Sequence, residues 1–502
     1  MADEQTGKRE ERRRRMLTEP LVPLLIRTAL PTMLGMLVGT IYSLTDTFWI
    51  GLMNNTDMTA AVGVVFPFIS FVQAVGFWFG YGSGNVMARR LGENKAEEAE
   101  KTSSLGVFLA ASLGIILAAV CLLPVQPTAE FLGGGGSPAL LEQTASYLVV
   151  ISAAIPFQLI SVTVYNQLRL CGNVRDGMIC MGVGMFGNII LDPVFILGCN
   201  MGVSGAGLAT SLGQIASCIV LFIISGKHGN IPLRFFGFDL KDRRLYHILL
   251  GGAPNFSRQS ITSIATILLN KAAEPYGTAL IAAITVSSRV SAVAYMLMIG
   301  FGQGFQPICA MNCGAKQYDR VRKAFRLTVT IGTVFLTAAG ALLAVFAEPV
   351  TSAFASDDPE VVEKAVTLVR LQCISFPFLS FLAVSGMYMQ NVGMYIRSLL
   401  ISISRQGIVF IPLLFILPAV WQEWGLYVLQ PAADIVSFYG RFVCETGEDR
   451  VKIILFVSVR KLCYCVQIHF HSSSKQFFSN LMIPSSRSLH SSFDRALLSA
   501  LR

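Results

Sequence analysis

The chain has 502 residues, of which 53% are hydrophobic and 14% are charged, and its mean hydropathy is +0.60. A chain so apolar and so long does not stay dissolved in water, which excludes a soluble enzyme or binding domain and indicates lipid as the solvent. The formal net charge of +9 does not indicate nucleic-acid binding, because the basic residues are placed in loops and in the N-terminal segment.

Apolar stretches long enough to cross a bilayer follow one another along the chain. A hydrocarbon core about 30 Å thick requires roughly 20 apolar residues per helix. This criterion predicts an all-α polytopic membrane protein with about twelve transmembrane helices. We expect them near residues 24–48, 60–83, 104–125, 145–168, 178–198, 203–225, 247–270, 279–305, 327–347, 365–388, 398–418 and 424–439.

The N-terminal residues 1–20 form a basic tail that includes Arg12 to Arg15. The tail lacks the apolar run and cleavage site of a secretory signal peptide, so we interpret its arginines as a charge cluster that sets topology. Basic residues recur in alternate loops, including Arg89 and Arg90, Arg169 and Arg175, and Lys316 and Arg320. The positive-inside rule then predicts a multi-pass protein of the plasma or inner membrane with both termini in the cytoplasm.

The two halves of the sequence resemble each other at an offset near 222 residues. We therefore predict an internal duplication into two pseudo-symmetric six-helix lobes, 21–230 and 231–438, related by an axis along the membrane normal. Such a bundle suits rocking about a central cavity. The matched positions include Pro31 with Pro254, Gly82 with Gly304, Gly92 with Gly314, and Gly172 with Gly393.

The sequence changes character after the start of the twelfth predicted helix. We expect this helix to break at Tyr439, after only about fifteen residues, which is shorter than a usual span. Residues 439–502 are rich in Ser, His, Cys and basic residues, and the run at 451–459 is too short to cross a membrane. We hypothesise that they are a divergent or out-of-frame tail, without an ordered domain.

The eighth predicted span ends in a specific motif: Gly302-Gln303-Gly304-Phe305-Gln306-Pro307, then Asn312, Gly314-Ala315-Lys316 and Arg320-Val321. This segment resembles the signature loop of the multidrug and toxin extrusion family, and the resemblance extends over about 17–438. It implies a secondary transporter, not an enzyme, that exports small amphiphilic and often cationic drugs. It also implies H⁺ or Na⁺ as the coupling ion, and no cofactor.

Carboxylates inside the predicted spans are the strongest chemical signal. A charge at the bilayer centre costs at least about 2.5–3.5 kcal/mol, so such residues face protein or water. Asp46 lies in the first span and Asp192 in the fifth. Asn188 precedes Asp192 by four residues, which places the two side chains on one helix face. No acid occurs in the tenth span, so we do not expect ion coupling in the second lobe.

The family resemblance implies a cation site formed by Asp46, Asn188, Asp192 and Thr210. Asn166 in the fourth span is a weaker candidate, and we expect ion binding to bend the first helix at a hinge near Pro31. These oxygen ligands suit Na⁺, and burial and mutual repulsion both favour a shared proton on paired carboxylates. The alternative is that Asp46 is hydrated at its helix end and that Asp192 only marks a kink before Pro193.

The substrate cavity is less well specified by the sequence. Aromatic and thioether side chains adapt to varied amphiphilic cations, although lipid contact or core packing would explain the same residues. Arg258 and Arg289 lie within spans, where they either pair with backbone carbonyls or line the cavity. The candidates for the cavity are Phe71, Trp78, Tyr165, Arg258, Arg289 and Met296.

Three other functions remain to be weighed. A flippase of lipid-linked saccharides has a similar fold and uses cavity arginines, so Arg258 and Arg289 keep it open. A membrane-embedded enzyme would need a nucleophile or clustered metal ligands inside the spans, and none is evident in the sequence. A scaffold would not retain acids in the membrane at such a cost. We expect a monomer in the lipid bilayer.

Overall fold

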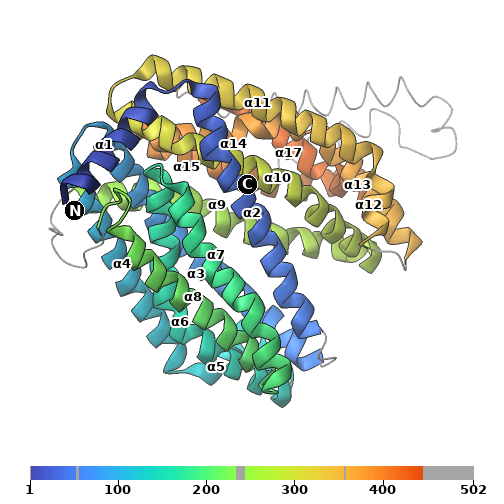
Figure 1. Cartoon of the computed structure of the whole chain (residues 1–502). Coiled ribbons are helices and arrows are strands. Elements are labelled where there is room, and N and C mark those ends of the chain that lie inside the picture. Colours follow the sequence, from blue (N-terminus) through green and yellow to red (C-terminus); the bar gives the residue numbers. More distant parts are fainter. Residues whose placement is uncertain (1, 52–55, 233–242, 355–357, 445–502) are drawn as a thin grey trace, which may run out of the picture. The chain divides into compact units, whose positions relative to one another are not determined.

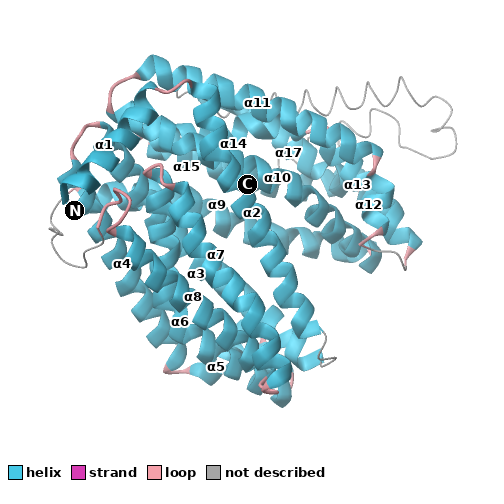
Figure 2. Ribbon diagram, viewed as in Figure 1, coloured by secondary structure: helices cyan, strands magenta, loops and turns pink. Residues whose placement is uncertain are grey.

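The computed structural model describes residues 2–51, 56–232, 243–354 and 358–444. These ranges consist of helices joined by short loops and contain no strand (Figure 2). The all-α prediction is therefore confirmed. The helices of the first half (Figure 1) are α1 (Ala2–Thr18), α2 (Leu21–Gly51), α3 (Thr56–Gly92), α4 (Ala96–Leu122), α5 (Val125–Leu132), α6 (Pro138–Leu170), α7 (Val174–Pro193), the π-helical turn η2 (Val194–Gly198) and α8 (Gly202–Ser225).

The second half continues the same architecture. Its elements are α9 (Arg244–Ala273), α10 (Thr278–Gly314), α11 (Tyr318–Val345), α12 (Ala347–Ser352), α13 (Pro359–Cys373), α14 (Phe376–Val392), α15 (Tyr395–Ile403), the π-helical turn η4 (Ser404–Ile408), α16 (Phe410–Trp421) and α17 (Glu423–Cys444). The short 3-10 turns η1 (Gly134–Gly136) and η3 (Glu274–Tyr276) precede α6 and α10.

Nine helices in the described ranges are long and apolar enough to cross a membrane. A tenth span results if α13 and α14, which meet at a bend of 59°, are counted together. The other two predicted spans, 247–270 and 424–439, also fall on helices, namely α9 and α17. The structure thus agrees with a polytopic membrane protein built from the predicted segments.

The twelfth predicted helix is longer than the sequence suggested. α17 does not break at Tyr439 but continues to Cys444, which gives 22 residues. At 1.5 Å per residue this helix is about 33 Å long, enough to cross a hydrocarbon core. The expectation of a short helix was wrong because it relied on Gly440, and a single glycine costs a helix only about 1 kcal/mol. From residue 445 on, the predicted tail lies outside the described residues.

The contacts divide the chain into two compact units. The first comprises Met1–Ser260, Met296–Thr328 and Gly386–Leu399, and the second comprises Ile261–Tyr295, Val329–Ser385 and Leu400–Arg502. The first unit thus contains the whole first half together with one end of several helices of the second half. The lobes 21–230 and 231–438 were predicted from sequence repetition, whereas the compact units are defined by contacts. The units therefore do not test the bounds of the lobes, which stay a prediction.

Each unit has its own apolar core. In the first unit, α6 packs against α3, α4 and α8, and Ile155 and Leu159 of α6 are fully buried among residues of α3 and α4. In the second unit, α16 and α17 pack against each other. Leu413 and Leu417 of α16 share a buried cluster with Ala433 of α17. The second unit also contains the end of α9 and the start of α10 that belong to this cluster.

Two pairs of glycines mark reciprocal helix crossings inside the first unit. A Cβ atom on Gly92 at the end of α3 would clash with the carbonyl group of Met311 in α10. A Cβ atom on Gly314 at the end of α10 would clash with the carbonyl group of Arg89 in α3. Only glycine allows so close an approach of two backbones. Because Gly92 and Gly314 are matched positions of the sequence repeat, the two copies meet here in a symmetric way.

The second pair of glycines, Gly82 and Gly304, lies nearer the middle of the same two helices, α3 and α10. A Cβ atom on Gly82 of α3 would clash with the carbonyl group of Ile248 in α9, and one on Gly304 of α10 would clash with the backbone of Ala29 in α2. Helix α3 of the first half thus crosses α9 of the second, while α10 of the second half crosses α2 of the first. The predicted pseudo-two-fold axis would produce such an exchange of contacts, and the axis itself stays a prediction.

Helix ends follow ordinary local rules. Ser137 precedes α6 and accepts a hydrogen bond from the Leu140 amide at 3.0 Å, with Pro138 at the first helical position. Gly172 after α6 has φ +82° and Gly393 after α14 has φ +96°, the left-handed conformation that favours glycine at a helix C-terminus. The recurrence of Gly172 as Gly393 in the sequence therefore has a conformational cause.

Candidate functional site

Three of the predicted site residues meet between α7 and α8. The amide Nδ2 of Asn188 donates to Asp192 Oδ1 at 3.2 Å and to Thr210 Oγ1 at 3.2 Å. Asp192 is fully buried, Asn188 is 2% exposed, and Thr210 is half-buried. The four-residue spacing along α7 brings the amide and the carboxylate to one face, as the sequence predicted, and α8 supplies the hydroxyl.

Glycines let α7 and α8 approach closely enough for these short side chains to meet. A Cβ atom on Gly184 of α7 would clash with the Gly213 carbonyl and the Ser217 side chain of α8. A Cβ atom on Gly213 would in turn lie 2.7 Å from the Gly184 carbonyl oxygen and 3.4 Å from the Asn188 Cβ. Small residues commonly serve this purpose between helices in membranes.

The cluster is rich in oxygen atoms. Within the described part of the chain, Asn188 Oδ1 is buried and accepts no hydrogen bond. Together with the Asp192 carboxylate and Thr210 Oγ1, it gives three kinds of oxygen ligand, the type that Na⁺ and other hard cations prefer. Among the described residues, no three His, Cys, Asp or Glu side chains gather as a metal site. The donor set therefore fits a proton or an alkali cation.

Asp46 and Pro31 both belong to α2, which packs against α7 and α8. Pro31 lies inside a helix that runs from Leu21 to Gly51, so α2 lacks one backbone hydrogen bond there. The backbone of Asp46 is helical, but its side chain lies outside what the structure describes. The participation of Asp46 in the cation site and the role of Pro31 as a hinge stay predictions.

Asn166 belongs to another cluster, which surrounds Arg169. The Asn166 Nδ2 donates to the Val162 carbonyl at 2.8 Å, and its Oδ1 accepts from Arg169 Nη2 at 3.0 Å. Arg169 Nη1 donates to Gln306 Oε1 at 2.8 Å, and its guanidinium lies 4.9 Å from the centre of the Tyr81 ring. The Asn166 carbonyl oxygen is thus already engaged by a cation of the protein itself.

The position of Arg169 corrects the sequence analysis. We expected it in a basic loop, but it lies in the last turn of α6 and is fully buried. Its partners Gln303 and Gln306 come from α10 of the second half, far along the chain. The available signal was the three-residue spacing of Asn166 and Arg169 and of Gln303 and Gln306, which places polar groups on one face of each helix.

The predicted aromatic residues are partly brought together. The Trp78 ring stacks on Phe256 of α9 with centroids 4.7 Å apart, and its Nε1 donates to the Leu249 carbonyl at 2.7 Å. Phe71 is 44% exposed and makes an edge contact with Phe256 at 6.0 Å. Phe256 itself was not predicted. Tyr165 lies against α7 beside Gly177, and the structure gives Tyr165 no ring contact with this group.

The remaining predicted cavity residues lie in α9 and α10. Arg258 is half-buried in α9, in the first compact unit. Arg289 of α10 is exposed and belongs to the second unit, whereas Met296 of the same helix is 40% exposed and belongs to the first. None of the contacts described for these three residues assigns them a ligand, so their place in a substrate cavity stays a prediction.

The second unit contains an intramembrane ion pair that the sequence analysis missed. Arg405 Nε donates to Asp434 Oδ1 at 2.5 Å, and Asp434 is fully buried. Gln430 and Ser375 donate to the same carboxylate at 3.0 and 2.9 Å. The prediction of intramembrane acids only in the first half was therefore incomplete. Asp434 lies within the predicted span 424–439, and counting every acid inside the spans would have found it.

The long apolar helices, the repeat and the buried polar cluster define a polytopic α-helical membrane transporter. The sequence model of one family, described as MatE, matches the chain twice, at residues 31–194 and 254–416. The chain belongs to the MatE family. The two matches agree with the internal duplication inferred from the sequence, and the prediction of a transporter in place of an enzyme is confirmed.

Relatives and solved structures resemble most of the chain. The multidrug export protein MepA of Staphylococcus aureus (strain MRSA252) is 26% identical over 446 residues, which cover 86% of this chain and 96% of MepA. MepA of Staphylococcus haemolyticus (strain JCSC1435) is also 26% identical, over 85% of this chain and 93% of its own length.

Among solved structures, an outward-facing multidrug resistance MATE transporter of the MOP superfamily has a TM-score of 0.79 at 22% identity, over 88% of this chain and 98% of its own. A MOP superfamily transporter from Pyrococcus furiosus gives the same values. These likenesses establish the fold.

Proposed function

We propose that this protein exports small amphiphilic, often cationic, drugs and toxins in exchange for H⁺ or Na⁺. Two facts support the proposal. The MepA relatives are named multidrug export proteins, and the chain carries a buried carboxylate–amide–hydroxyl cluster formed by Asp192, Asn188 and Thr210. The cluster is the observation that carries the coupling part of the proposal, because a carboxylate buried in a membrane helix is costly unless it has a function.

The proposed coupling follows from charge neutralisation. H⁺ or Na⁺ binds at Asp192, with Asn188, Thr210 and Asp46 as further ligands, and lowers the negative charge of the cluster by one. The ion-bound form then favours a conformation with lower affinity for a cationic substrate, through a change of α2 near Pro31. Differential affinity for two conformations is what allows a bound ion to shift them. Alternating exposure of the cavity to the two membrane faces completes the transport cycle.

The driving force is adequate for such an exchange. An electrochemical gradient of the coupling ion of about 100 mV releases about 2.3 kcal/mol per ion, so a gradient of about 180 mV supplies roughly 4 kcal/mol. Since every 1.4 kcal/mol corresponds to about a tenfold ratio, this energy supports an electrochemical gradient of the substrate of about a thousandfold. The aromatic group of Phe71, Trp78 and Phe256 would offer an adaptable apolar surface to the substrate. The basic loops favour a plasma-membrane location with both termini in the cytoplasm.

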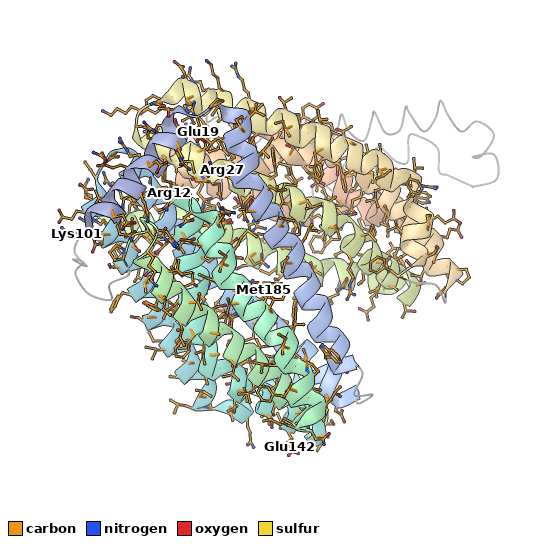
Figure 3. All side chains as sticks on the ribbon, in the orientation of Figure 1. Arg12, Glu19, Arg27, Lys101, Glu142 and Met185 are labelled. Carbon is orange, nitrogen blue, oxygen red and sulfur yellow. The ribbon has the colours of Figure 1, made fainter. Side chains whose placement is uncertain are left out.

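Ion-driven efflux from proteoliposomes tests the proposal. The full chain is reconstituted, loaded with a fluorescent lipophilic cation, and given an imposed H⁺ or Na⁺ gradient in separate samples. We expect efflux that accelerates with one of the two gradients and that Asp192→Asn abolishes. Glu142→Gln is the matched control, because Glu142 is an exposed acid near the start of α6 (Figure 3) and is not part of the Asp192 cluster. Wild-type rates in Asp192→Asn, or efflux that responds to neither gradient, would refute the coupling.

The flippase alternative is not carried into this proposal. It rested on Arg258 and Arg289, and the relatives that match over most of the chain are named for drug export. The same liposomes distinguish the two functions, since a flippase would move a labelled lipid-linked saccharide and leave the fluorescent cation inside.

A further inference from the structure

A cavity of about 260 Å³ lies where α1, α2 and the start of α7 meet, inside the first compact unit. Its volume is far above the roughly 10–15 Å³ that a single water requires. Five basic side chains line it, namely Lys8, Arg12 and Arg15 of α1, Arg27 of α2, and Arg175 of α7. Arg12 and Arg27 lie near each other at this end of the molecule, as does Glu19 (Figure 3).

The wall formed by α1 is held in place by specific hydrogen bonds. Arg9 Nη2 donates to the Asn230 carbonyl at 3.2 Å, and Arg12 Nη1 donates to Asn230 Oδ1 at 3.2 Å. Arg13 Nη2 donates to the Gly92 carbonyl at 2.9 Å. Residues 1–20 were predicted to be a basic tail with a role in topology, and the structure shows that Ala2–Thr18 form a helix. This helix is docked on the end of α3 and on the loop after α8, so the cavity has a defined wall.

The charge of the cavity is only partly compensated by the protein. Arg15 pairs with Glu11, which also lines the cavity, and Lys8 pairs with Glu4 at 2.6 Å. Glu19 is the second carboxylate in the lining. Within the described residues, Arg27 and Arg175 form neither an ion pair nor a hydrogen bond. Two guanidinium groups from different helices thus face one cavity without an acidic partner of their own, which is the arrangement that binds phosphate.

Apolar surfaces lead away from the cavity along both helices that carry these arginines. On α2, the residues Val22, Ile26, Leu30 and Leu34 are each about half exposed, between 48% and 54%. On α7, the residues Ile179, Val183, Phe186 and Ile190 are 42% to 65% exposed. Both sets are spaced by three or four residues, so each forms a continuous stripe, and α2 and α7 pack against each other. A phosphate in the cavity would therefore have acyl-chain surface beside it.

We propose that the cavity between α1, α2 and α7 binds the phosphate headgroup of an anionic phospholipid, with Arg27 and Arg175 as its principal ligands and the acyl chains along α2 and α7. The shared chemistry is a phosphate anion, and the adjacent apolar stripes favour lipid over free phosphate. Basic pockets between transmembrane helices near the cytoplasmic face bind such headgroups. The bound lipid would fasten α1 to α2 and α7, so it would stabilise the docked position of α1. This site does not depend on drug export.

Thermal unfolding of the full chain in an uncharged detergent tests this site. The protein is titrated with short-chain phosphatidylglycerol, short-chain phosphatidylcholine, glycerol phosphate and inorganic phosphate in parallel. We expect phosphatidylglycerol to raise the melting temperature by several degrees, phosphatidylcholine to have no effect, and the two chain-free phosphates to act only at much higher concentration. Selective binding to the folded state raises its apparent stability as the ligand concentration rises above the dissociation constant.

Substitutions of the two unpaired arginines localise the effect. Arg27→Gln with Arg175→Gln should weaken phosphatidylglycerol binding by about tenfold per arginine, since a charge-assisted hydrogen bond is worth at least about 1.5 kcal/mol. Arg27→Lys with Arg175→Lys should retain part of the affinity. Arg14→Gln with Arg322→Gln is the control with the same change in net charge, because both are exposed and neither lines the cavity.

The outcomes separate three cases. Loss of the phosphatidylglycerol effect in the Gln variant, with the control variant unchanged, supports the lipid site. Equal stabilisation by phosphatidylcholine, or an unchanged effect in the Gln variant, overturns it. If inorganic phosphate stabilises the wild type as strongly as phosphatidylglycerol does, and the Gln variant loses both effects, the cavity is an anion site and the lipid assignment is wrong.

Discussion

Equivalent helix pairs in the two halves carry their buried acids in different ways. In the first half, α7 and α8 bring the Asp192 carboxylate to the neutral amide of Asn188, which also contacts Thr210. In the second half, η4 and α17 bring Asp434 to the guanidinium of Arg405. Both carboxylates are fully buried. A cation of the same chain thus binds Asp434, whereas the neutral amide of Asn188 contacts Asp192.

We propose that the two copies of the fold use their buried acids for separate tasks. A buried ion pair with further hydrogen bonds is a fixed structural contact, and removing one partner is strongly destabilising. A buried carboxylate among neutral oxygen and amide groups instead suits an exchangeable cation. The following predictions test whether the two acids divide in this way between structure and ion coupling.

The largest effect is expected from exchanging the two acids for amides. Asp192→Asn should reduce ion-driven efflux to the level of protein-free liposomes. Its melting temperature in detergent should stay close to that of the wild type. Asp434→Asn should do the reverse, with coupled efflux per folded molecule retained and a much lower melting temperature. Measuring both quantities on both variants decides the question. Equal loss of coupling in the two variants would end the proposed division.

The next largest effect is expected from removing Arg405, the basic partner of Asp434. Arg405→Met leaves Asp434 buried without its guanidinium and should cost about 3–5 kcal/mol of stability. The double variant Arg405→Met with Asp434→Leu removes both charges and should regain most of that loss, because a buried ion pair can be replaced by apolar residues at little cost. Thermal unfolding in detergent measures both. A double variant no more stable than Arg405→Met would show that the unpaired charge of Asp434 is not the cause of the lost stability.

The symmetry of the helix crossings predicts a smaller and equal effect in each half. Gly92→Ala and Gly314→Ala should each destabilise by about 1–3 kcal/mol, because the added methyl group clashes with a backbone carbonyl in both cases. Gly63→Ala on α3 is the control, since nothing lies within 4 Å of a Cβ atom there, and it should be neutral or slightly stabilising. Clearly unequal melting temperatures for Gly92→Ala and Gly314→Ala would argue against equivalent crossings.

The smallest effects concern the hydroxyl groups beside each acid. Thr210→Val removes an acceptor from the Asn188 amide, and Ser375→Ala removes a donor at 2.9 Å from Asp434. Each should cost about 0.5–1.5 kcal/mol in stability. Only Thr210→Val should also raise the ion concentration needed for half-maximal efflux. An unchanged ion dependence in Thr210→Val would remove this residue from the proposed site.

The sequence predicted well whatever depends on local periodicity. The twelve apolar segments all fall on helices, and the four-residue spacing of Asn188 and Asp192 correctly places both side chains on one face of α7. Thr210 could be assigned only through the family resemblance, because its contact with Asn188 depends on how α8 packs on α7. The hydrogen bonds bring these residues together, and their role in ion binding stays a prediction.

The sequence failed where a side chain's surroundings come from a distant segment. Arg169 stands at the end of an apolar run, where a loop charge is the usual explanation, and only the arrival of Gln303 and Gln306 from α10 buries it. The same is true of Arg9, Arg12 and Arg13, whose acceptors lie at the end of α3 and after α8. The density of basic residues along the sequence is enough to predict the topology of the chain. The partner of each basic side chain depends on the tertiary fold, so composition does not predict it.

The contact between Gly92 of α3 and Met311 of α10 cannot form until translation of the chain has reached α10. Met311 is synthesised about 220 residues after Gly92, and at about 5–20 residues per second the delay is roughly 10–40 s. During that time the end of α3 lies in the membrane without its contact to α10. A nascent first half therefore has its crossing surface open to other proteins until translation of the second half supplies the matching glycine.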